Sequence, residues 1–435
     1  MDKKPKYIKL FEELKDKINN GEYKANERLP SKRILALNLN LSINTIINAY
    51  NLLLDEGYIY SKEKKGYYVV SQLVVVSKND DVINSPAVTP HYEYDFTTAN
   101  VEDFKSTNFK RIIKERLNNN DYLMKSSYLG SDELRIEIKN HLKKNRGINT
   151  SYNNIVIMSG IEDLERVLKL INIDNITLEN PGYHKLSTIA RNINKTVNYI
   201  SLDSEGCLVP NYKTILYTTP FNQFPTGVKM SIKRKKELVR YLSKTNSYLI
   251  EDDFDAEFRI NSSPTTAIYT LDNSNVIFFS TFSTTLYPGL RLAYAILPNN
   301  LLTLYKEKYQ SYASFVPMLL QLTIKDFIKD GYYASFINRR KKAYINKRLR
   351  IMQALDKHNI DYNEKANYLS LLIDIGKCVD DSLLKKLKDN GINIEGLSSF
   401  DVNNKNSNYL ILGYTAISID KIDKGIEKLK KIIGD

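Results

Sequence analysis

Residues 279–292 read Phe-Ser-Thr-Phe-Ser-Thr-Thr-Leu-Tyr-Pro-Gly-Leu-Arg-Leu, and this stretch decides the fold of most of the chain. The apolar run at residues 276–279 leads into it and predicts a buried strand. Hydroxyl side chains, a Pro-Gly turn and Arg291 follow. Clustered hydroxyls and backbone N–H groups beside one guanidinium are typical of a phosphate-binding turn. We therefore expect an anion-binding site at the end of this strand.

The sequence around this stretch alternates between strand-like and helical patterns from residue 94 onward. Short apolar runs that each end in a turn or in polar residues occupy residues 155–158, 175–179, 215–217 and 247–250. Such alternation predicts a mostly parallel sheet covered by helices. Ligands of these sheets bind at the carboxyl ends of the strands. The motif residues of this domain all fall at such strand ends.

The first seventy residues predict a different and smaller fold. Apolar residues at helical spacing indicate three helices, with Ser31 and Ser42 as the N-caps of the second and third. The third helix is expected from Ile43 to about Asp55. Two strand-like runs joined by residues 62–66 then predict a basic β-hairpin. Three small helices followed by a basic hairpin make a winged helix-turn-helix.

Composition narrows the range of partners. The chain has 435 residues, a formal net charge of +13 and a pI of about 9.2, which favours a polyanionic partner. Residues 1–70 hold 13 lysines and arginines against 9 acidic residues, consistent with phosphate contact. Two cysteines cannot make a disulfide framework, and no signal peptide or bilayer-spanning run is found. We expect a cytoplasmic protein without a membrane partner or a dedicated zinc site.

The rest of the chain divides into a linker and one large domain. Residues 71–92 have loop composition and predict a tether. Residues 93–435 form the large domain, with a small α+β subdomain at about 335–435. A long helix is expected from near Tyr333. Its basic residues at 339–342, 347–348 and 350 are interpreted as a solvated face, with extra DNA backbone contact in a dimer as the alternative.

Residues 1–70 closely resemble the DNA-binding domain of the GntR family. The resemblance rests on Gly21, residues 29–31, residues 35–36, residues 49–50 and residues 56–57 in their order and spacing. It implies a double-stranded DNA operator as partner. The residues that it and helix chemistry assign to DNA binding are Arg33, Ser42, Asn44, Thr45, Asn48, Lys64 and Gly66. One departure is Ile43, where the family usually has arginine. A small protein-binding winged helix is the structural alternative.

The large domain resembles the fold-type I aminotransferase-like domain found in the MocR-type subfamily of GntR regulators. In that family a lysine holds pyridoxal phosphate as a Schiff base, an aspartate pairs with the pyridine nitrogen, and an aromatic residue stacks on the ring. The resemblance places the corresponding pocket at Tyr183, Asn222, Asp252, Thr281, Ser283, Thr284 and Arg291. An ordinary helix N-cap is the alternative role for Asp252.

Four departures from the family pattern fall along this one pocket. Thr284 stands at the lysine position, and no lysine occurs between Lys244 and Lys306. Phe254 replaces a tyrosine, and Ile411 replaces an arginine that can bind a substrate carboxylate. The acidic residues at 162–163 follow Ser-Gly where the family has small or amide residues near the phosphate, and like charge there is unfavourable.

These observations predict a homodimeric DNA-binding transcriptional regulator, head-to-tail by resemblance, whose large domain is a pseudo-aminotransferase that senses a ligand or serves for dimerisation. No catalytic or metal site and no covalent cofactor are expected. Non-covalent binding of pyridoxal phosphate or another anion stays open. The alternatives are a pyridoxal-phosphate-dependent aminotransferase with an appended DNA-binding module, and a structural repressor without an effector. The sequence does not identify the operator, the regulated genes, the sign of regulation or the effector.

Overall fold

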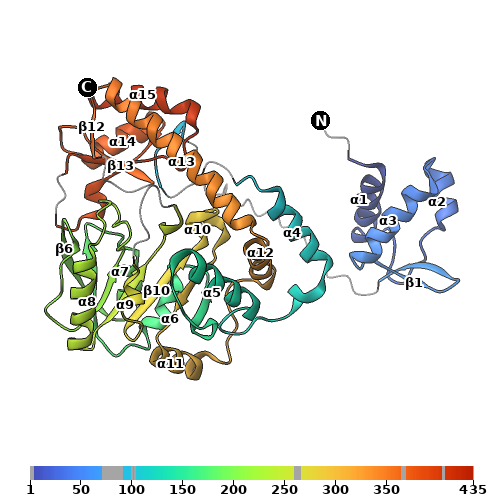
Figure 1. Cartoon of the computed structure of the whole chain (residues 1–435). Helices are drawn as coiled ribbons and strands as arrows, with labels where there is room; N and C mark the ends of the chain where they lie inside the picture. The colour runs from blue at the N-terminus through green and yellow to red at the C-terminus, as the bar shows by residue number, and fades with distance from the viewer. Residues whose placement is uncertain are drawn as a thin grey trace. The chain divides into compact units, whose positions relative to one another are not determined.

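The computed structural model describes residues 4–70, 92–98, 101, 104–258, 266–363, 369–403 and 407–434. The chain forms two compact units, Met1–Thr89 and Pro90–Asp435 (Figure 1). The predicted linker lies outside the described residues except for Tyr92. None of the helices in the described ranges combines the length and hydropathy that a membrane span requires.

The first unit is a winged helix-turn-helix, as predicted. The side chains of Ser31 and Ser42 accept hydrogen bonds from the backbone N–H groups of Ile34 and Thr45 and so cap the second and third helices. Tyr50 is fully buried where the third helix meets the other two. The elements are α1 (Lys6–Asn19), α2 (Lys32–Leu39), α3 (Ile43–Asp55) and the antiparallel hairpin β1 (Ile59–Lys62) and β2 (Gly66–Val69).

The second unit is built on an eight-stranded, mostly parallel sheet, which also confirms the prediction. The strand next to the edge, β11, runs antiparallel to both of its neighbours, and β7 is antiparallel to β6. The other pairs are parallel. In spatial order the strands are β4 (Ile155–Met158), β11 (Ala293–Ile296), β10 (Val276–Thr281), β9 (Tyr248–Asp252), β8 (Ile215–Thr218), β5 (Asn175–Asn180), β6 (Thr196–Asp203) and β7 (Gly206–Cys207).

Both faces of this sheet are buried over its central strands, which are largely apolar, whereas β6 near one edge is partly exposed. Ile155 and Ile157 of β4 belong to one core, and Val156 and Met158 belong to the other. The period-two alternation thus divides each strand between two helical layers. The first core includes residues of α4 (Thr107–Asn118), α5 (Asp132–Arg146), α8 (Ile232–Thr245), α9 (Ile268–Leu271) and α12 (Met318–Lys329). The second includes residues of α6 (Leu164–Leu168), α7 (Lys185–Asn192) and α11 (Asn299–Tyr309).

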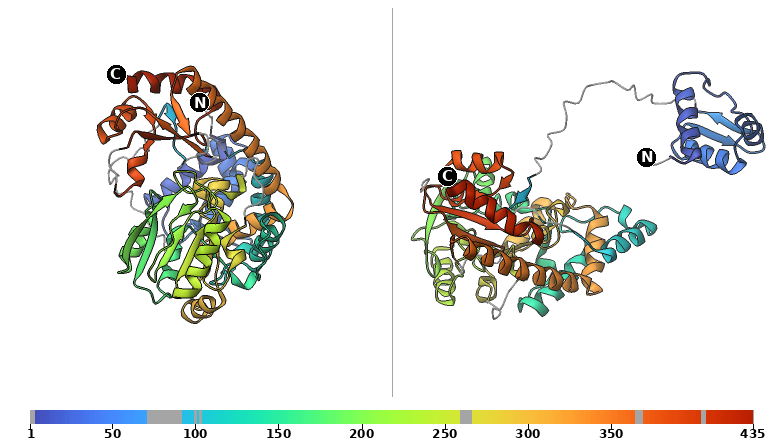
Figure 2. Two further views of the ribbon diagram at one scale, coloured as in Figure 1. Left: turned by 60° about the vertical axis from the view of Figure 1, so that its left-hand side comes forward. Right: turned by 90° about the horizontal axis from the view of Figure 1, so that it is seen from above.

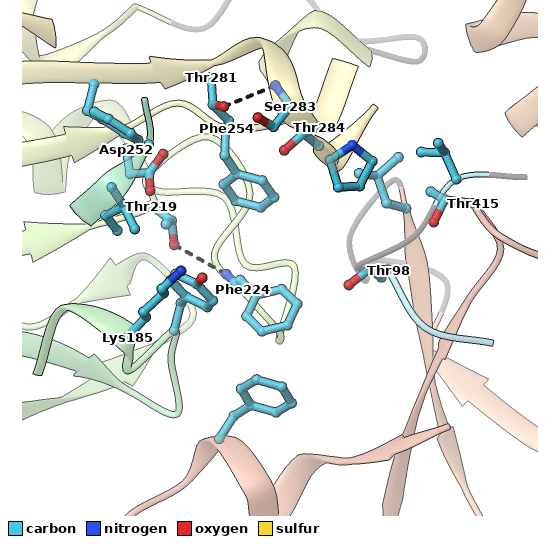
Figure 3. A pocket seen from close by; sticks show the side chains of 18 of the residues that line it. Thr98, Lys185, Thr219, Phe224, Asp252, Phe254, Thr281, Ser283, Thr284 and Thr415 are labelled. Atoms are coloured by element: carbon cyan, nitrogen blue, oxygen red, sulfur yellow. Dashed lines mark hydrogen bonds between the residues drawn. The ribbon is translucent and has the colours of Figure 1, made fainter. Parts of the chain in front are cut away.

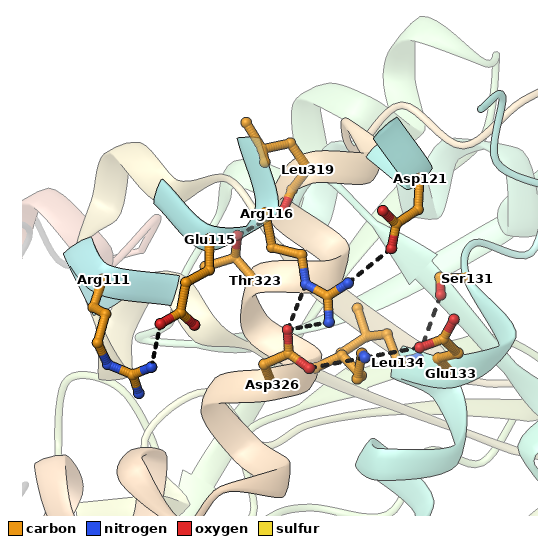
Figure 4. Close-up of polar contacts among 11 residues, drawn as sticks. Arg111, Glu115, Arg116, Asp121, Ser131, Glu133, Leu134, Leu319, Thr323 and Asp326 are labelled. Atoms are coloured by element: carbon orange, nitrogen blue, oxygen red, sulfur yellow. Dashed lines mark hydrogen bonds and ion pairs between the residues drawn. The ribbon is translucent and has the colours of Figure 1, made fainter. Parts of the chain in front are cut away.

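Ion pairs join three of these helices at one end of the unit (Figure 4). Arg116 of α4 donates from Nε to Asp326 of α12 at 2.5 Å. Lys325 of α12 binds Glu133 of α5 and Asp326, each at 2.8 Å. Arg116 and Lys325 are mostly buried, so this network fixes the helices more firmly than exposed pairs would.

The C-terminal part packs a small sheet against the long helix α13 (Tyr332–Lys357) and α15 (Ile422–Gly434), which lie against each other (Figure 2). The start of α13 near Tyr333 is confirmed, but the solvated basic face is wrong in part. Arg340 and Lys347 are buried, and Arg340 donates from Nη1 to the carbonyl of Thr285 at 3.0 Å. The remaining elements are β12 (Asp361–Asn363), β13 (Ser370–Asp374), β16 (Tyr409–Gly413) and β15 (Glu395–Gly396) in one sheet, β3 (Tyr94–Asp95) paired with β14 (Ile392–Asn393), and α14 (Asp381–Asp389).

Candidate functional site

A pocket of about 340 Å³ opens at the carboxyl ends of the central strands of the second unit. Most of its lining residues follow or end β4, β5, β8, β9 and β10, which is where ligands of such sheets bind, and the others are Thr98, Val101 and residues of the C-terminal part. Figure 3 shows Asp252 and the segment 281–284 on one wall, with Thr98 and Thr415 across from them. Six of the seven predicted pocket residues line it: Tyr183, Asp252, Thr281, Ser283, Thr284 and Arg291.

Asp252 is the last residue of β9 and is 5 % exposed. Its Oδ2 accepts a hydrogen bond from the Tyr217 hydroxyl at 2.5 Å, while its buried Oδ1 has no partner among the described residues. Burial and the nearby carboxylates of Asp253 and Glu179 raise the pKa of Asp252 to about 7, although the bond from Tyr217 opposes this rise. No helix begins at Asp252, because the next helical turn starts at Ala256, so the N-cap alternative is wrong.

The hydroxyl-rich segment forms the short helix α10 (Phe282–Thr285) directly after β10. The Thr281 hydroxyl oxygen accepts from the Ser283 N–H at 3.1 Å (Figure 3). The Ser283 Oγ is buried without a partner among the described residues. From behind, α13 holds the segment, since Tyr333 donates to the Thr285 hydroxyl at 3.2 Å and Arg340 binds the Thr285 carbonyl. The lining hydroxyls are thus presented on a fixed backbone.

Arg291 does not face the pocket with a free guanidinium. Its Nη2 lies 2.6 Å from Oε2 of Glu162, and Lys185 binds the other carboxylate oxygen of the same residue. Partial burial alone would raise the pKa of Glu162, but the hydrogen bonds from Lys185 and Arg291 lower it to about 2. Glu162 is therefore ionised at neutral pH and bridges both cations at this rim.

The remaining predicted positions have structural roles. Asn222 does not line the pocket: it is 1 % exposed and donates to Asp255 at 2.9 Å. Asp163 accepts from the Ser159 N–H at 2.6 Å and so closes the turn after β4. Ile411 is buried in β16 and is not a lining residue.

The sequence reasoning missed several lining residues. Lys185 lies at the start of α7, and Glu395 comes from β15 in the C-terminal sheet. Phe400 was missed as well: it contacts Phe224, which belongs to the predicted turn near the cofactor ring, edge to face with ring centroids 4.9 Å apart, and both line the pocket. Lys185 was detectable, because it stands two residues after Tyr183. Glu395 and Phe400 reach the pocket only through the tertiary packing of a distant part of the chain.

In the first unit, the predicted DNA-contact residues fall on α2, α3 and the wing. Arg33, Asn44, Asn48 and Lys64 are exposed, and Asn44 and Asn48 are one helical turn apart on α3. Gly66 has a φ of +113°, and a Cβ there would lie 3.1 Å from Nε of Arg28. The wing therefore requires glycine at this position.

Ser42 and Thr45 form a hydrogen bond with each other, which uses part of their hydrogen-bonding capacity. Their hydroxyl oxygens lie 2.8 Å apart, and Ser42 also caps α3. The sequence reasoning missed Arg28, an exposed residue paired with wing strand β2. It included Lys62 in the basic hairpin without assigning it a DNA contact, and this lysine lies over the Tyr68 ring at 4.8 Å. The signal available for Lys62 was the lysine-rich run at residues 62–65, which lies between tyrosines of the two wing strands. These residues enlarge the basic surface beside α3.

Substitution of Arg33 tests this surface. We expect Arg33→Ala to weaken binding to a duplex selected by the wild-type protein by about tenfold, because one phosphate or guanine contact is lost. The measurement is fluorescence anisotropy at several salt concentrations. Lys17→Ala is the matched control, since Lys17 is paired with Glu13 at 2.9 Å on α1. Equal losses in the two variants would reduce the effect to net charge and remove Arg33 from the interface.

Comparison with known proteins agrees with this architecture. Residues 92–429 match the family aminotransferase class I and II, and residues 6–69 match the family of bacterial regulatory proteins, gntR family. The chain is 30% identical to the uncharacterized HTH-type transcriptional regulator YdeL of Bacillus subtilis, over 98% of this chain and 96% of that protein. It is 25% identical to the probable rhizopine catabolism regulatory protein MocR of Rhizobium meliloti, over 98% and 93%.

Solved structures extend the likeness in the large unit. An archaeal alanine:glyoxylate aminotransferase superposes with a TM-score of 0.71 at 23% identity, over 80% of this chain and 91% of that one. Fold and relatives together define a winged helix-turn-helix transcriptional regulator with an aminotransferase-like domain. The chain belongs to the MocR-type subfamily of the GntR family and is a DNA-binding regulator.

Aminotransferases of this fold use pyridoxal phosphate, and the pocket fits that cofactor only in part. The free Oδ1 of Asp252 and the ring of Tyr183 suit the pyridine ring. The phosphate end does not fit, because Arg291 already binds Glu162. Thr284 lines the pocket with a hydroxyl, which cannot form a Schiff base.

Proposed function

We propose that the aminotransferase-like domain does not catalyse transamination and is the ligand-sensing domain of a homodimeric regulator. The observation that carries the proposal is that Thr284 lines the pocket, since the sequence resemblance assigns this position to the family's catalytic lysine. Threonine cannot form an imine with an aldehyde. Two buried polar atoms at the pocket, Asp252 Oδ1 and Ser283 Oγ, have no partner among the described residues, which supports ligand binding over a purely structural role.

A homodimer suits this proposal, since a two-fold operator presents two half-sites to two reading heads. The DNA-contact residues are Arg33, Ser42, Asn44, Thr45, Asn48, Lys64 and Gly66, with Arg28 and Lys62 added.

The test is incubation with pyridoxal phosphate, borohydride reduction and intact-mass analysis, combined with a coupled transaminase assay. We expect no added mass and no turnover. The control is Lys185→Ala, because Lys185 is the one lysine among the described residues that line the pocket. A wild-type adduct that this variant loses would make Lys185 the replacement amine. Turnover would establish the enzyme alternative.

Non-covalent pyridoxal phosphate is the second candidate occupant, favoured by Asp252 and Tyr183 in the ring-binding half. Non-covalent binding would give a saturable change in the absorbance spectrum during titration, and the protein would show no added mass after borohydride reduction. The ion pair of Arg291 with Glu162 weighs against it.

A further inference from the structure

The charged groups of the pocket differ in whether they form ion pairs: its cations do, and two of its carboxylates do not. The cations, Lys185 and Arg291, both bind Glu162. The Oδ1 of Asp252 has no hydrogen-bond partner, and neither Asp252 nor Glu395 forms an ion pair among the described residues, although Lys388 acts on Glu395 from a greater distance. Burial raises the pKa of Glu395, although the positive charge of Lys388 opposes this rise. When Asp252 and Glu395 are both ionised, the three carboxylates of the pocket exceed its two cations by one negative charge, and the raised pKa values of Asp252 and Glu395 move that state toward higher pH.

Glu162 occupies the place at which Arg291 would hold an anionic ligand. The contact is close to the backbone: a Cβ on Gly160 would lie 2.4 Å from Nη2 of Arg291 and 2.5 Å from Oε2 of Glu162. The carboxylate and the guanidinium thus lie directly over the Gly160 Cα. We call this position beside Arg291 and Gly160 the anion seat. The Glu162 carboxylate occupies the anion seat and also binds Lys185.

This pairing matters more for ligand choice than for stability. The side chains of Arg291 and Glu162 are 50% and 41% exposed, so the ion pair itself stabilises the fold little. A phosphate, however, must displace Glu162 and then remain beside its negative charge. Each effect weakens anion binding, and they act together.

The rest of the pocket suits an organic cation with an aromatic or apolar body. Phe224, Phe254, Phe279 and Phe400 contribute apolar surface to the lining. The Asp252 Oδ1 offers a buried acceptor. Threonine hydroxyls complete the wall. A compact protonated amine would bury its body among the rings and place its N–H groups on carboxylate oxygens.

We propose that Glu162 closes the anion seat of this pocket, so that the regulator binds a phosphate-free protonated amine and discriminates against its phosphorylated counterpart. The inference deepens the proposed sensing function and rests on it. It assigns the ligand class by chemistry: an aromatic or apolar amine without a phosphate group.

The experiment uses a matched pair of probes, pyridoxamine and its phosphate ester, with the full-length protein. They differ only in the phosphate group, and calorimetric titration gives both affinities. We expect wild-type protein to bind pyridoxamine at least about tenfold more tightly than the ester. Equal or tighter binding of the ester would overturn the proposal. Binding of neither probe would overturn the amine assignment.

Glu162→Gln supplies the decisive variant because it keeps the side-chain shape and removes the internal anion. We expect it to reverse the preference and to gain binding of the ester and of inorganic phosphate. Glu165→Gln is the matched control, since Glu165 is a neighbouring acidic residue that pairs with Lys169 on α6 and does not line the pocket. No gain in Glu162→Gln, or an equal gain in both variants, would overturn the closed seat.

Asp252→Asn provides the other arm and should lose pyridoxamine binding by about tenfold or more. Transaminase turnover is measured on the same samples. Turnover would overturn the proposed function whatever the affinities are. Absence of turnover together with equal affinities for the two probes would overturn only the present inference.

Discussion

Replacement of Arg146 by methionine is expected to destabilise the large unit by about 3–5 kcal/mol, because it leaves a buried carboxylate without its guanidinium. Arg146 ends α5, and Asp253 directly follows β9. Both side chains are 4% exposed, and the second of their two hydrogen bonds, from Nη2 to Oδ1, is 2.9 Å long. Burial alone would lower the pKa of Arg146, but Asp253 raises it, so the pair is ionised.

Chemical denaturation at neutral pH measures this effect. Arg111→Met is the control, because Arg111 forms an exposed pair with Glu115 on α4, and its loss should cost at most about 1 kcal/mol. The double variant Arg146→Met with Asp253→Asn should recover part of the stability, since it removes the stranded charge. Equal small losses for Arg146→Met and Arg111→Met would show that the buried pair contributes little.

The same pair explains why the pocket wall is rigid. Asp253 lies next to Asp252, and Ser280 donates to the Asp253 carbonyl at 3.3 Å. The helix α5, the end of β9 and the end of β10 are thereby joined directly behind the lining residues. A loosened Arg146 variant should therefore also lose pocket preorganisation, which the probe titrations would register.

The sequence predicted the position of the pocket because the relevant signals are local. Apolar runs end at Asp252 and Thr281, and strand ends of a parallel sheet meet at one edge. A winged helix is equally local, since Ser31 and Ser42 mark their own helix starts. The resemblance added which side chains to expect at each strand end, and six of the seven do line the pocket.

What the sequence could not supply are the partners of those side chains. Glu162 was identified as an unfavourable acidic neighbour, yet its bridge to Arg291 spans 129 positions. The basic run on α13 was interpreted as solvated, because helical periodicity does not reveal that Arg340 reaches the Thr285 carbonyl of another element. The partners of long polar side chains depend on the tertiary structure, and hydrophobic periodicity and sequence motifs do not determine which distant residues come into contact.

Asp252→Asn is expected to stabilise the unliganded protein at pH 8 by about 2–4 kcal/mol. The reason is that the pKa of Asp252 is raised to about 7 in the folded protein, so that the ionised carboxylate destabilises the fold at pH 8. An ordinary aspartate titrates near pH 4. Between these values the folded protein keeps a proton that the unfolded chain has released, so the free energy of unfolding of the wild type falls as pH rises. The advantage of the variant should therefore shrink from pH 8 downward and vanish below about pH 4.

Denaturation across this pH range tests the prediction, with the exposed Asp330→Asn as a control that should show no such trend. A variant less stable than wild type at pH 8 would mean that Asp252 has a stabilising partner and is not an open acceptor. A carboxylate that destabilises the folded state is retained where it serves a ligand.

Saturating pyridoxamine should accordingly stabilise the wild type more at pH 8 than at pH 6, since only the ionised Asp252 attracts the cation. In Asp252→Asn this pH-dependent gain should be absent, because the amide carries no charge at either pH.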